Sequence, residues 1–156
     1  MKKILFSLIP LALVASSASA ANYVGGSVGS GGSLHYQSDL STGSSVRYGL
    51  DLNAVNFNFS RISVGGSVDY LTDISNQNFG GLAPYYGFGL GAGVSLGSPT
   101  GVSVYPHVLG GLKYDIASTP LSVFGELNVG VSIAIGSSTG VGFGSGARIG
   151  LNYRLP

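Results

Sequence analysis

The residues of this chain that could carry out acid–base or nucleophilic chemistry are few and widely spaced. There are two histidines, His35 and His107, six single carboxylates and many serines. A serine nucleophile site needs a serine, a histidine and a carboxylate in hydrogen-bonding geometry. All three residue types are present, but no serine lies at a recognisable spacing from either histidine. The sequence therefore predicts no catalytic residue.

Metal and cofactor sites are not predicted either. Two isolated histidines lack the spacing of metal-ligand motifs, and the chain has no cysteine. The segments 87–92 and 142–147 both match the pattern G-x-G-x-x-A, which resembles the dinucleotide-binding fingerprint. That fingerprint opens a helix, and neither segment is followed by helical periodicity. We expect no cofactor and no metal ion.

The ionisable residues lie in segments that alternate between apolar and polar positions. In 141–155 the odd positions are apolar apart from Ser145, and the even positions hold glycine, asparagine and arginine. A period of two residues is that of a β-strand with one apolar face. Six more segments alternate in this way: 23–36, 46–53, 62–70, 86–96, 102–114 and 121–135. The parity of the second changes near Ala54, which predicts a bulge or a turn.

Short connections made of turn-forming residues separate these segments. They are 37–44, 73–83, 97–101, 115–120 and 136–140. Such connections join antiparallel neighbours, because a parallel crossover needs about a dozen residues or more. No segment after residue 20 has apolar residues at helical spacing. The sequence therefore predicts an all-β, antiparallel fold.

The apolar faces of seven segments are too many for the core of one small soluble domain. Apolar residues outward and polar residues inward, in a dyad repeat, indicate a transmembrane β-barrel. No charged residue occurs between Asp73 and Lys113, which is rare in a soluble domain. In a barrel the inward face would carry a polar cluster, which consists of Arg47, Asp51, Asp69, His107, Lys113, Glu126 and Arg148.

Glycine and tyrosine agree with this interpretation. Most of the 27 glycines occupy the inward positions, where a narrow barrel has room for only some side chains. Tyrosines occupy outward positions near strand ends, where amphipathic rings form a girdle at a membrane surface. The predicted girdle is Tyr36, Tyr48, Tyr70, Tyr86, Tyr114 and Tyr153.

The first twenty residues predict export. Lys2 and Lys3 precede an apolar stretch that is too short for a spanning helix, which needs about 17 residues or more. Small residues follow, with Ala18 and Ala20 before the expected cleavage site and Ala21 after it. These features predict a signal peptide at 1–20 and a single barrel domain at 21–156.

The charge of the remaining chain excludes a nucleic-acid partner. Without Lys2 and Lys3, five cations stand against six acids, for a net charge of −1. The five cations are scattered singly, whereas neutralising phosphates requires a cluster of Lys and Arg.

At this point the chain resembles the small outer-membrane β-barrels of the OmpX kind and the OmpA membrane domain. The resemblance rests on the predicted signal peptide, on the alternation, and on the end Ile149, Leu151, Tyr153, Leu155, which looks like the signal read by the outer-membrane assembly machinery. That signal usually ends with an aromatic residue, which Leu155 and Pro156 replace here. The resemblance implies an even number of strands, eight in place of the seven identified. Either the region 73–83 contains the eighth, or the broken second segment is two strands, or the barrel is atypical. The resemblance also implies the assembly machinery and outer-membrane lipid as partners.

These observations favour a non-enzymatic, porin-like barrel with a structural or surface-interaction role in the cell envelope and a largely closed lumen. Barrels of this size also include lipid-modifying enzymes, but none of their motifs matches this chain. A narrow channel and a secreted soluble β-sandwich remain alternatives. The loops identify no ligand.

One ion pair is predicted inside the barrel. If the hairpin around 136–140 is symmetric, Glu126 lies opposite Gly150, and Arg148 is its diagonal neighbour. A lone carboxylate in a narrow lumen is costly to leave ionised, so Arg148 is expected to compensate the charge of Glu126.

Overall fold

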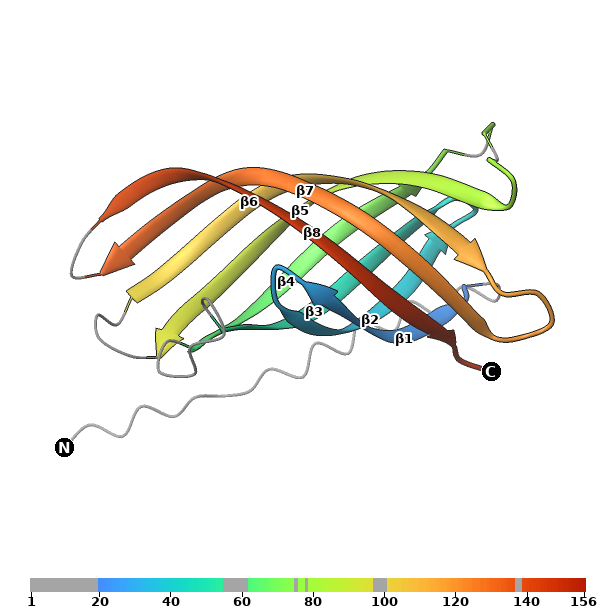
Figure 1. Cartoon of the computed structure of the whole chain (residues 1–156), viewed down its shortest axis with the longest axis horizontal. Helices are drawn as coiled ribbons and strands as arrows, with labels where there is room; N and C mark the ends of the chain where they lie inside the picture. Colours follow the sequence, from blue (N-terminus) through green and yellow to red (C-terminus); the bar gives the residue numbers. More distant parts are fainter. Residues whose placement is uncertain (1–19, 55–61, 75, 78, 97–100, 137–138) are drawn as a thin grey trace.

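The structure is a closed barrel of eight antiparallel strands, each paired with its neighbours along the chain and β1 paired with β8 (Figure 1). The computed structural model describes residues 20–54, 62–74, 76–77, 79–96, 101–136 and 139–156. The strands are β1 Asn22–Gly29, β2 Gly32–Ser41, β3 Ser44–Ala54, β4 Ile62–Asp73, β5 Leu82–Leu96, β6 Gly101–Asp115, β7 Leu121–Gly136 and β8 Gly140–Arg154. Within these residues no helix has the length and hydropathy needed to span a membrane.

The eighth strand comes from neither of the two expected places. The second segment lies in the single strand β3, and the described part of 73–83 holds only the ends of β4 and β5. The alternating stretch 23–36 is two strands, β1 and β2, joined by a tight turn at Ser30–Gly31. Val28 pairs with Gly32, so two even-numbered residues face each other across the hairpin. Because directly opposite residues share a face, the alternation continues through the turn without a change of parity. The parity change expected near Ala54 falls at 55–61, outside the described residues.

Both ends of the expected loop 37–44 differ from the prediction. The segment 37–44 was expected to be a loop, but 37–41 continues β2 and Ser44 begins β3, leaving a turn at Thr42–Gly43. Gly43 has a φ of 89°, which favours glycine. The polar residues Gln37 and Ser45 resemble turn formers in the sequence because their positions point into the lumen, where they hydrogen-bond each other.

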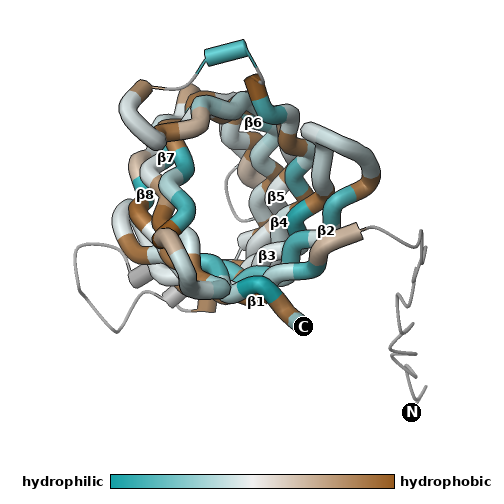
Figure 2. Tube along the Cα trace, turned by 90° about the vertical axis from the view of Figure 1, so that its right-hand side faces the viewer, coloured by the Kyte–Doolittle hydropathy of each residue, from teal (hydrophilic) through white to brown (hydrophobic). Residues whose placement is uncertain are grey.

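Figure 2 shows the strands as a ring around a central axis. The outward positions are strongly exposed, with Leu34 at 70%, Leu127 at 66% and Phe143 at 97%. The inward positions carry the buried polar residues, including Arg47, Asp69 and Glu126. A sandwich, in which the apolar faces would form the core, is therefore wrong for the described chain.

The two ends of the barrel differ. We call the end that holds Asn22 and Arg154 the terminal end and the opposite one the far end. Toward the terminal end the lumen is filled by the buried side chains of Leu71, Tyr85, Leu109 and Phe124. A cavity there measures about 20 Å³, which leaves room for about one water molecule. Toward the far end the lumen widens into a cavity of about 360 Å³, which we call the cup.

Candidate functional site in the lumen

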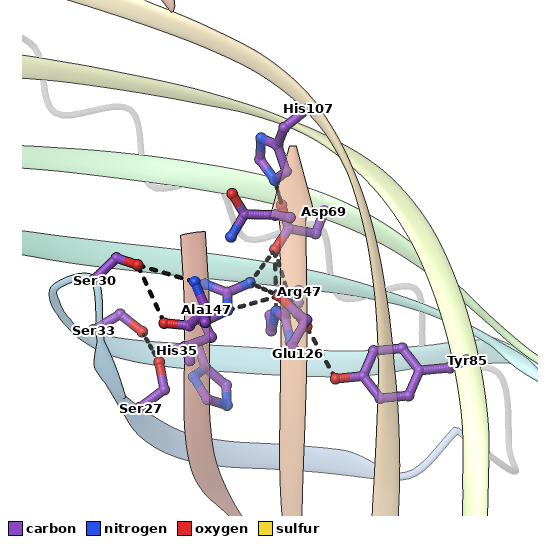
Figure 3. A network of polar contacts seen from close by, with 12 residues as sticks. Ser27, Ser30, Ser33, His35, Arg47, Asp69, Tyr85, His107, Glu126 and Ala147 are labelled. Atoms are coloured by element: carbon purple, nitrogen blue, oxygen red, sulfur yellow. Dashed lines mark hydrogen bonds and ion pairs between the residues drawn. The ribbon is translucent and has the colours of Figure 1, made fainter. Parts of the chain in front are cut away.

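The centre of the lumen holds four charged side chains in one ion-pair network (Figure 3). Arg47 on β3 lies directly opposite Asp69 on β4, and Glu126 on β7 lies directly opposite Arg148 on β8. Each residue reaches the inward face because it shares the parity of its strand's glycines and serines. Strand register therefore makes two ion pairs, and barrel closure brings the two pairs together.

Each arginine bonds to both carboxylates. Arg47 Nη2 donates to Asp69 Oδ2 and to Glu126 Oε2, both at 2.8 Å. Arg148 Nε donates to Glu126 Oε1 at 2.7 Å, and its Nη2 donates to Asp69 Oδ2 at 3.2 Å. The four groups thus form a charge-balanced quartet across the lumen. Charges withdrawn from water require such compensation, because each unpaired ion would carry a large desolvation penalty.

Two further residues complete the hydrogen bonding of the carboxylates. The Tyr85 hydroxyl donates to Glu126 Oε2 at 2.9 Å, and His107 Nε2 lies 3.1 Å from Asp69 Oδ1. The other ring nitrogen of His107 lies 3.0 Å from the carbonyl oxygen of Tyr105. Within the described chain, no buried side-chain nitrogen or oxygen lacks a hydrogen-bond partner. A fully satisfied network of this kind rigidifies its surroundings.

An apolar and amide layer lies on the terminal side of the network. The Phe124 ring lies 5.7 Å from the Arg47 guanidinium carbon and 5.6 Å from the His35 ring. His35 Nε2 is 2.6 Å from Asn152 Oδ1. Gly150 leaves the room for Phe124, because a Cβ at Gly150 would overlap the phenyl ring. Two successive layers of side chains therefore cross the lumen.

The structure brings together five of the seven residues of the predicted interior cluster: Arg47, Asp69, His107, Glu126 and Arg148. The other two lie apart. Lys113 points toward the terminal end, where its Nζ is 3.7 Å from Asp73 Oδ2. Asp51 lines the cup and takes part in none of the ion pairs of the described chain.

The predicted register of the last hairpin is wrong by two residues. Glu126 pairs with Arg148, and Gly150 lies opposite Phe124. The reason is the position of the turn. Ala134 pairs with Gly140, so the hairpin is centred one residue earlier in the chain than the symmetric 136–140 loop that was assumed. Arg148 is therefore the direct partner of Glu126, and the predicted diagonal contact does not describe the pair.

The expected tyrosine girdle occupies outward positions toward the terminal end. The exposed fractions of Tyr36, Tyr86, Tyr114 and Tyr153 lie between 41% and 54%. Tyr48 lies opposite Tyr36, and the Tyr70 ring contacts Phe88 at 5.5 Å. At the expected cleavage site, the carbonyl of Ala21 accepts a hydrogen bond from Asp39 N at 2.9 Å, so backbone hydrogen bonding to β2 begins one residue before β1. Ala18 lies outside the described residues, and Ala20 lies outside the strands.

Sequence reasoning missed the apolar part of the lumen filling. Leu71, Leu109 and Phe124 are apolar residues at inward positions, where only polar residues and tyrosines were expected. Parity alone could have found them, because each shares its face with the glycines of its strand. What parity does not give is their height in the barrel.

Comparison with known proteins gives matches to solved structures only. No protein-family model matches the chain, and no curated protein does. The N-terminal β-barrel domain of Pseudomonas aeruginosa OprF matches with a TM-score of 0.57 and 15% identity, over 87% of this chain and 96% of that domain. Neisserial surface protein A, NspA, matches with a TM-score of 0.58 and 13% identity, over 87% of this chain and 94% of that one.

A major outer membrane protein from Thermus thermophilus is also similar, with a TM-score of 0.51 and 16% identity, over 88% of this chain and 100% of that one. All three alignments span nearly the whole described barrel at identities that carry information on fold alone. The chain has the fold of the small outer-membrane β-barrels.

Proposed function

We propose that this protein is a non-enzymatic outer-membrane β-barrel with a closed lumen and a structural or surface-interaction role in the cell envelope. The observation that carries the proposal is the inverted distribution of side chains. Large apolar residues cover the outside of a closed barrel, while the quartet of Arg47, Asp69, Glu126 and Arg148 fills its centre. A bilayer accommodates this arrangement, because lipid solvates the apolar face and closure leaves no strand edge unpaired along most of the wall.

Fractionation tests the location. We expect the protein in the outer-membrane fraction, resistant to extraction by alkaline carbonate and soluble only with detergent. A chain that stays in the aqueous fraction without detergent would contradict the proposal and would support a secreted protein.

A closed lumen is supported by the two layers that cross it. The quartet spans β3, β4, β7 and β8, and Phe124 with Tyr85 fills the space toward the terminal end. An eight-stranded barrel is just wide enough to be filled by side chains. In planar bilayers we expect the wild-type protein to give no steady open-pore current, and large steady currents would favour the channel alternative.

The absence of catalysis is proposed on the contacts of the two histidines. His35 bonds to Asn152 and His107 bonds to Asp69, and in the described residues no serine hydroxyl bonds to either ring. A serine nucleophile needs such a base within about 3 Å. Mass spectrometry of lipid A from cells with and without the protein should show the same species, and a mass shift that requires the protein would favour a lipid-modifying enzyme.

A further inference from the structure

Among the described residues, no strand completes the wall of the barrel between the tip of the β1–β2 hairpin and the far end. Pairing of β1 with β8 ends at Gly29 and Arg148, and pairing of β2 with β3 ends at Gly32 and Leu52. β8 continues for eight more residues, from Gly140 to Ala147, without a strand neighbour on that side among the described residues. Figure 1 shows β8 running past the end of the short hairpin. We call this opening the window.

The window lies at the depth of the bilayer if the barrel spans a membrane, so this inference rests on the proposed function. A tilted strand needs about 9 to 11 residues to cross the hydrocarbon. The turn at Ser30–Gly31 lies five to six positions along the chain from the girdle residue Tyr36, which is about half the number of residues that a strand needs to cross the hydrocarbon. On β8, Tyr153 and the exposed Phe143 lie ten positions apart. The turn therefore lies near mid-membrane, and the window opens in the far half of the hydrocarbon.

The border of the window is polar and small. Ser30 N donates to Ala147 O at 3.0 Å, and Ala147 N donates to Ser30 Oγ at 3.0 Å, so the turn is tied to β8 (Figure 3). Alternate residues of a strand present their backbone groups to the same edge, so the N–H and C=O of Ser145 also face the window. Unpaired backbone groups at this depth have no water from the lipid side to bond with.

The cup lies directly behind the window. Its lining includes Ser30 and Gly31 from the turn together with Ser145, Gly146 and Ala147 from β8. Its volume of about 360 Å³ falls within the usual range for small-molecule sites, about 300 to 1,000 Å³. A polar cavity that borders the acyl region at one side suits a molecule with a polar head and an apolar tail.

The chemistry of the cup selects the head group. Its polar lining is mainly hydroxyl and amide, which includes Ser27, Ser33, Ser67, Ser103, Ser132 and Asn128. The guanidinium of Arg148 is already bonded to Glu126 and Asp69, so it is not available as a free countercharge for an anion. Asp51 adds a carboxylate outside the quartet, which can accept hydrogen bonds from hydroxyl groups. An anionic head would lose its hydration beside the Asp51 carboxylate and the balanced quartet, which opposes its binding. A cationic head could pair with Asp51, and this is the alternative that the dodecylammonium probe below tests.

We propose that the cup binds the uncharged, hydroxyl-bearing head of a single-chain amphiphile, which enters through the window while its tail stays in the bilayer. A glycerol or small glycoside head has this chemistry. Asp51 and the serines hold its hydroxyls, and the backbone groups of Ser145 bond to the polar part that crosses the window.

The test uses the whole mature barrel in phosphatidylcholine nanodiscs, followed by amide NMR. The probes are 1-dodecanoylglycerol, dodecylammonium, dodecyl sulfate and tailless glycerol. We expect 1-dodecanoylglycerol to give saturable shifts at the cup glycines Gly65, Gly91 and Gly93, with affinity at least about tenfold above that of the other three probes. Shifts confined to lipid-facing residues such as Leu127 would overturn the site. Equal binding of glycerol would overturn access through the window, and equal binding of a charged probe would overturn the head-group assignment.

Variants at Asp51 separate hydroxyl recognition from charge recognition. Asp51→Ala removes the hydrogen-bond acceptor and should weaken the binding of 1-dodecanoylglycerol by about tenfold. Asp51→Asn keeps one acceptor oxygen and should retain most of the binding affinity. Asp115→Asn, at the opposite end of the barrel, is the matched control. If Asp51→Asn weakens binding as much as Asp51→Ala, the carboxylate charge is the determinant and the proposed head group is wrong.

A diazirine on the acyl chain next to the glycerol ester locates the path of the tail. Crosslinks should concentrate on residues 30–32 and 144–147. An even distribution over the lipid-facing surface would contradict the window. A protein that does not insert into nanodiscs would instead contradict the proposed function, so the two failures are distinguishable.

Discussion

Glu126 and Arg148 lie directly opposite each other on β7 and β8, and Arg148 Nε donates to Glu126 Oε1 at 2.7 Å. The Glu126 side chain is fully buried, and that of Arg148 is 17% exposed. The second carboxylate oxygen of Glu126 accepts from Arg47 and Tyr85. The pair is therefore one edge of a larger network, and its removal affects residues on opposite walls of the barrel.

Replacing one member of this pair should destabilise the barrel by more than the loss of the hydrogen bonds of that residue alone. We expect Glu126→Gln and Arg148→Met each to lower the free energy of unfolding by about 2 to 4 kcal/mol, because each leaves buried charge uncompensated. The double variant should lose at least about 1 kcal/mol less than the sum. Unfolding titrations with urea in lipid vesicles measure the cycle, and strictly additive losses would show that the two side chains are not coupled.

The lipid-facing surface should respond to charge according to depth. Leu127 is 66% exposed at the middle of β7, whereas Val131 lies opposite Phe143 near the far end. Leu127→Arg should destabilise the barrel by about 2 to 4 kcal/mol, and Val131→Arg should cost about 0 to 1 kcal/mol. The same vesicle titrations compare them. Equal losses at both sites would contradict the placement of the hydrocarbon between the tyrosine girdle and Phe143.

Replacing a glycine beside the quartet by alanine should destabilise the barrel where the added Cβ has no room. A Cβ at Gly89 would overlap Asp69 Oδ1 and would lie 2.9 Å from His107 Nε2, whereas a Cβ at Gly142 meets nothing within 4 Å. We expect Gly89→Ala to destabilise by about 1 to 3 kcal/mol and Gly142→Ala to be neutral or stabilising by up to about 1 kcal/mol. Thermal unfolding in detergent compares the two, and indifference to both changes would mean that the quartet does not pack against β5.

Removing the aromatic layer should weaken the closure of the lumen. The double variant Tyr85→Ala, Phe124→Ala deletes the two largest side chains of the buried apolar cluster and leaves the carboxylate of Glu126 without its tyrosine donor. Each truncation is expected to destabilise by about 3 to 5 kcal/mol, so the experiment needs the variant refolded in detergent and checked by circular dichroism. Planar bilayer recordings of the folded variant should show currents that the wild type lacks. A folded variant that gives no more current than the wild type would show that the quartet alone blocks ion flow through the lumen.

The local sequence determined which way each side chain points. Alternation over β5 and β8 predicts their inward and outward faces correctly, because the pleat has a period of two and needs no information from elsewhere in the chain. The all-β fold and most of the inward positions follow from the same property. Even there, the hairpin turn at Ser30–Gly31 was invisible, since directly paired residues of equal parity carry the alternation through it.

Only the tertiary structure decided which inward residues meet. Arg47 and Glu126 are separated by 79 residues and come from strands that are not neighbours, yet Arg47 Nη2 lies 2.8 Å from Glu126 Oε2. Their contact depends on the register of every intervening hairpin and on closure of β1 against β8, because each two-residue change of register moves a side chain by about 7 Å along its strand. The same register leaves Asp51 outside the quartet. Side-chain direction is thus a local property of a strand, whereas height inside a barrel is the sum of all its pairings.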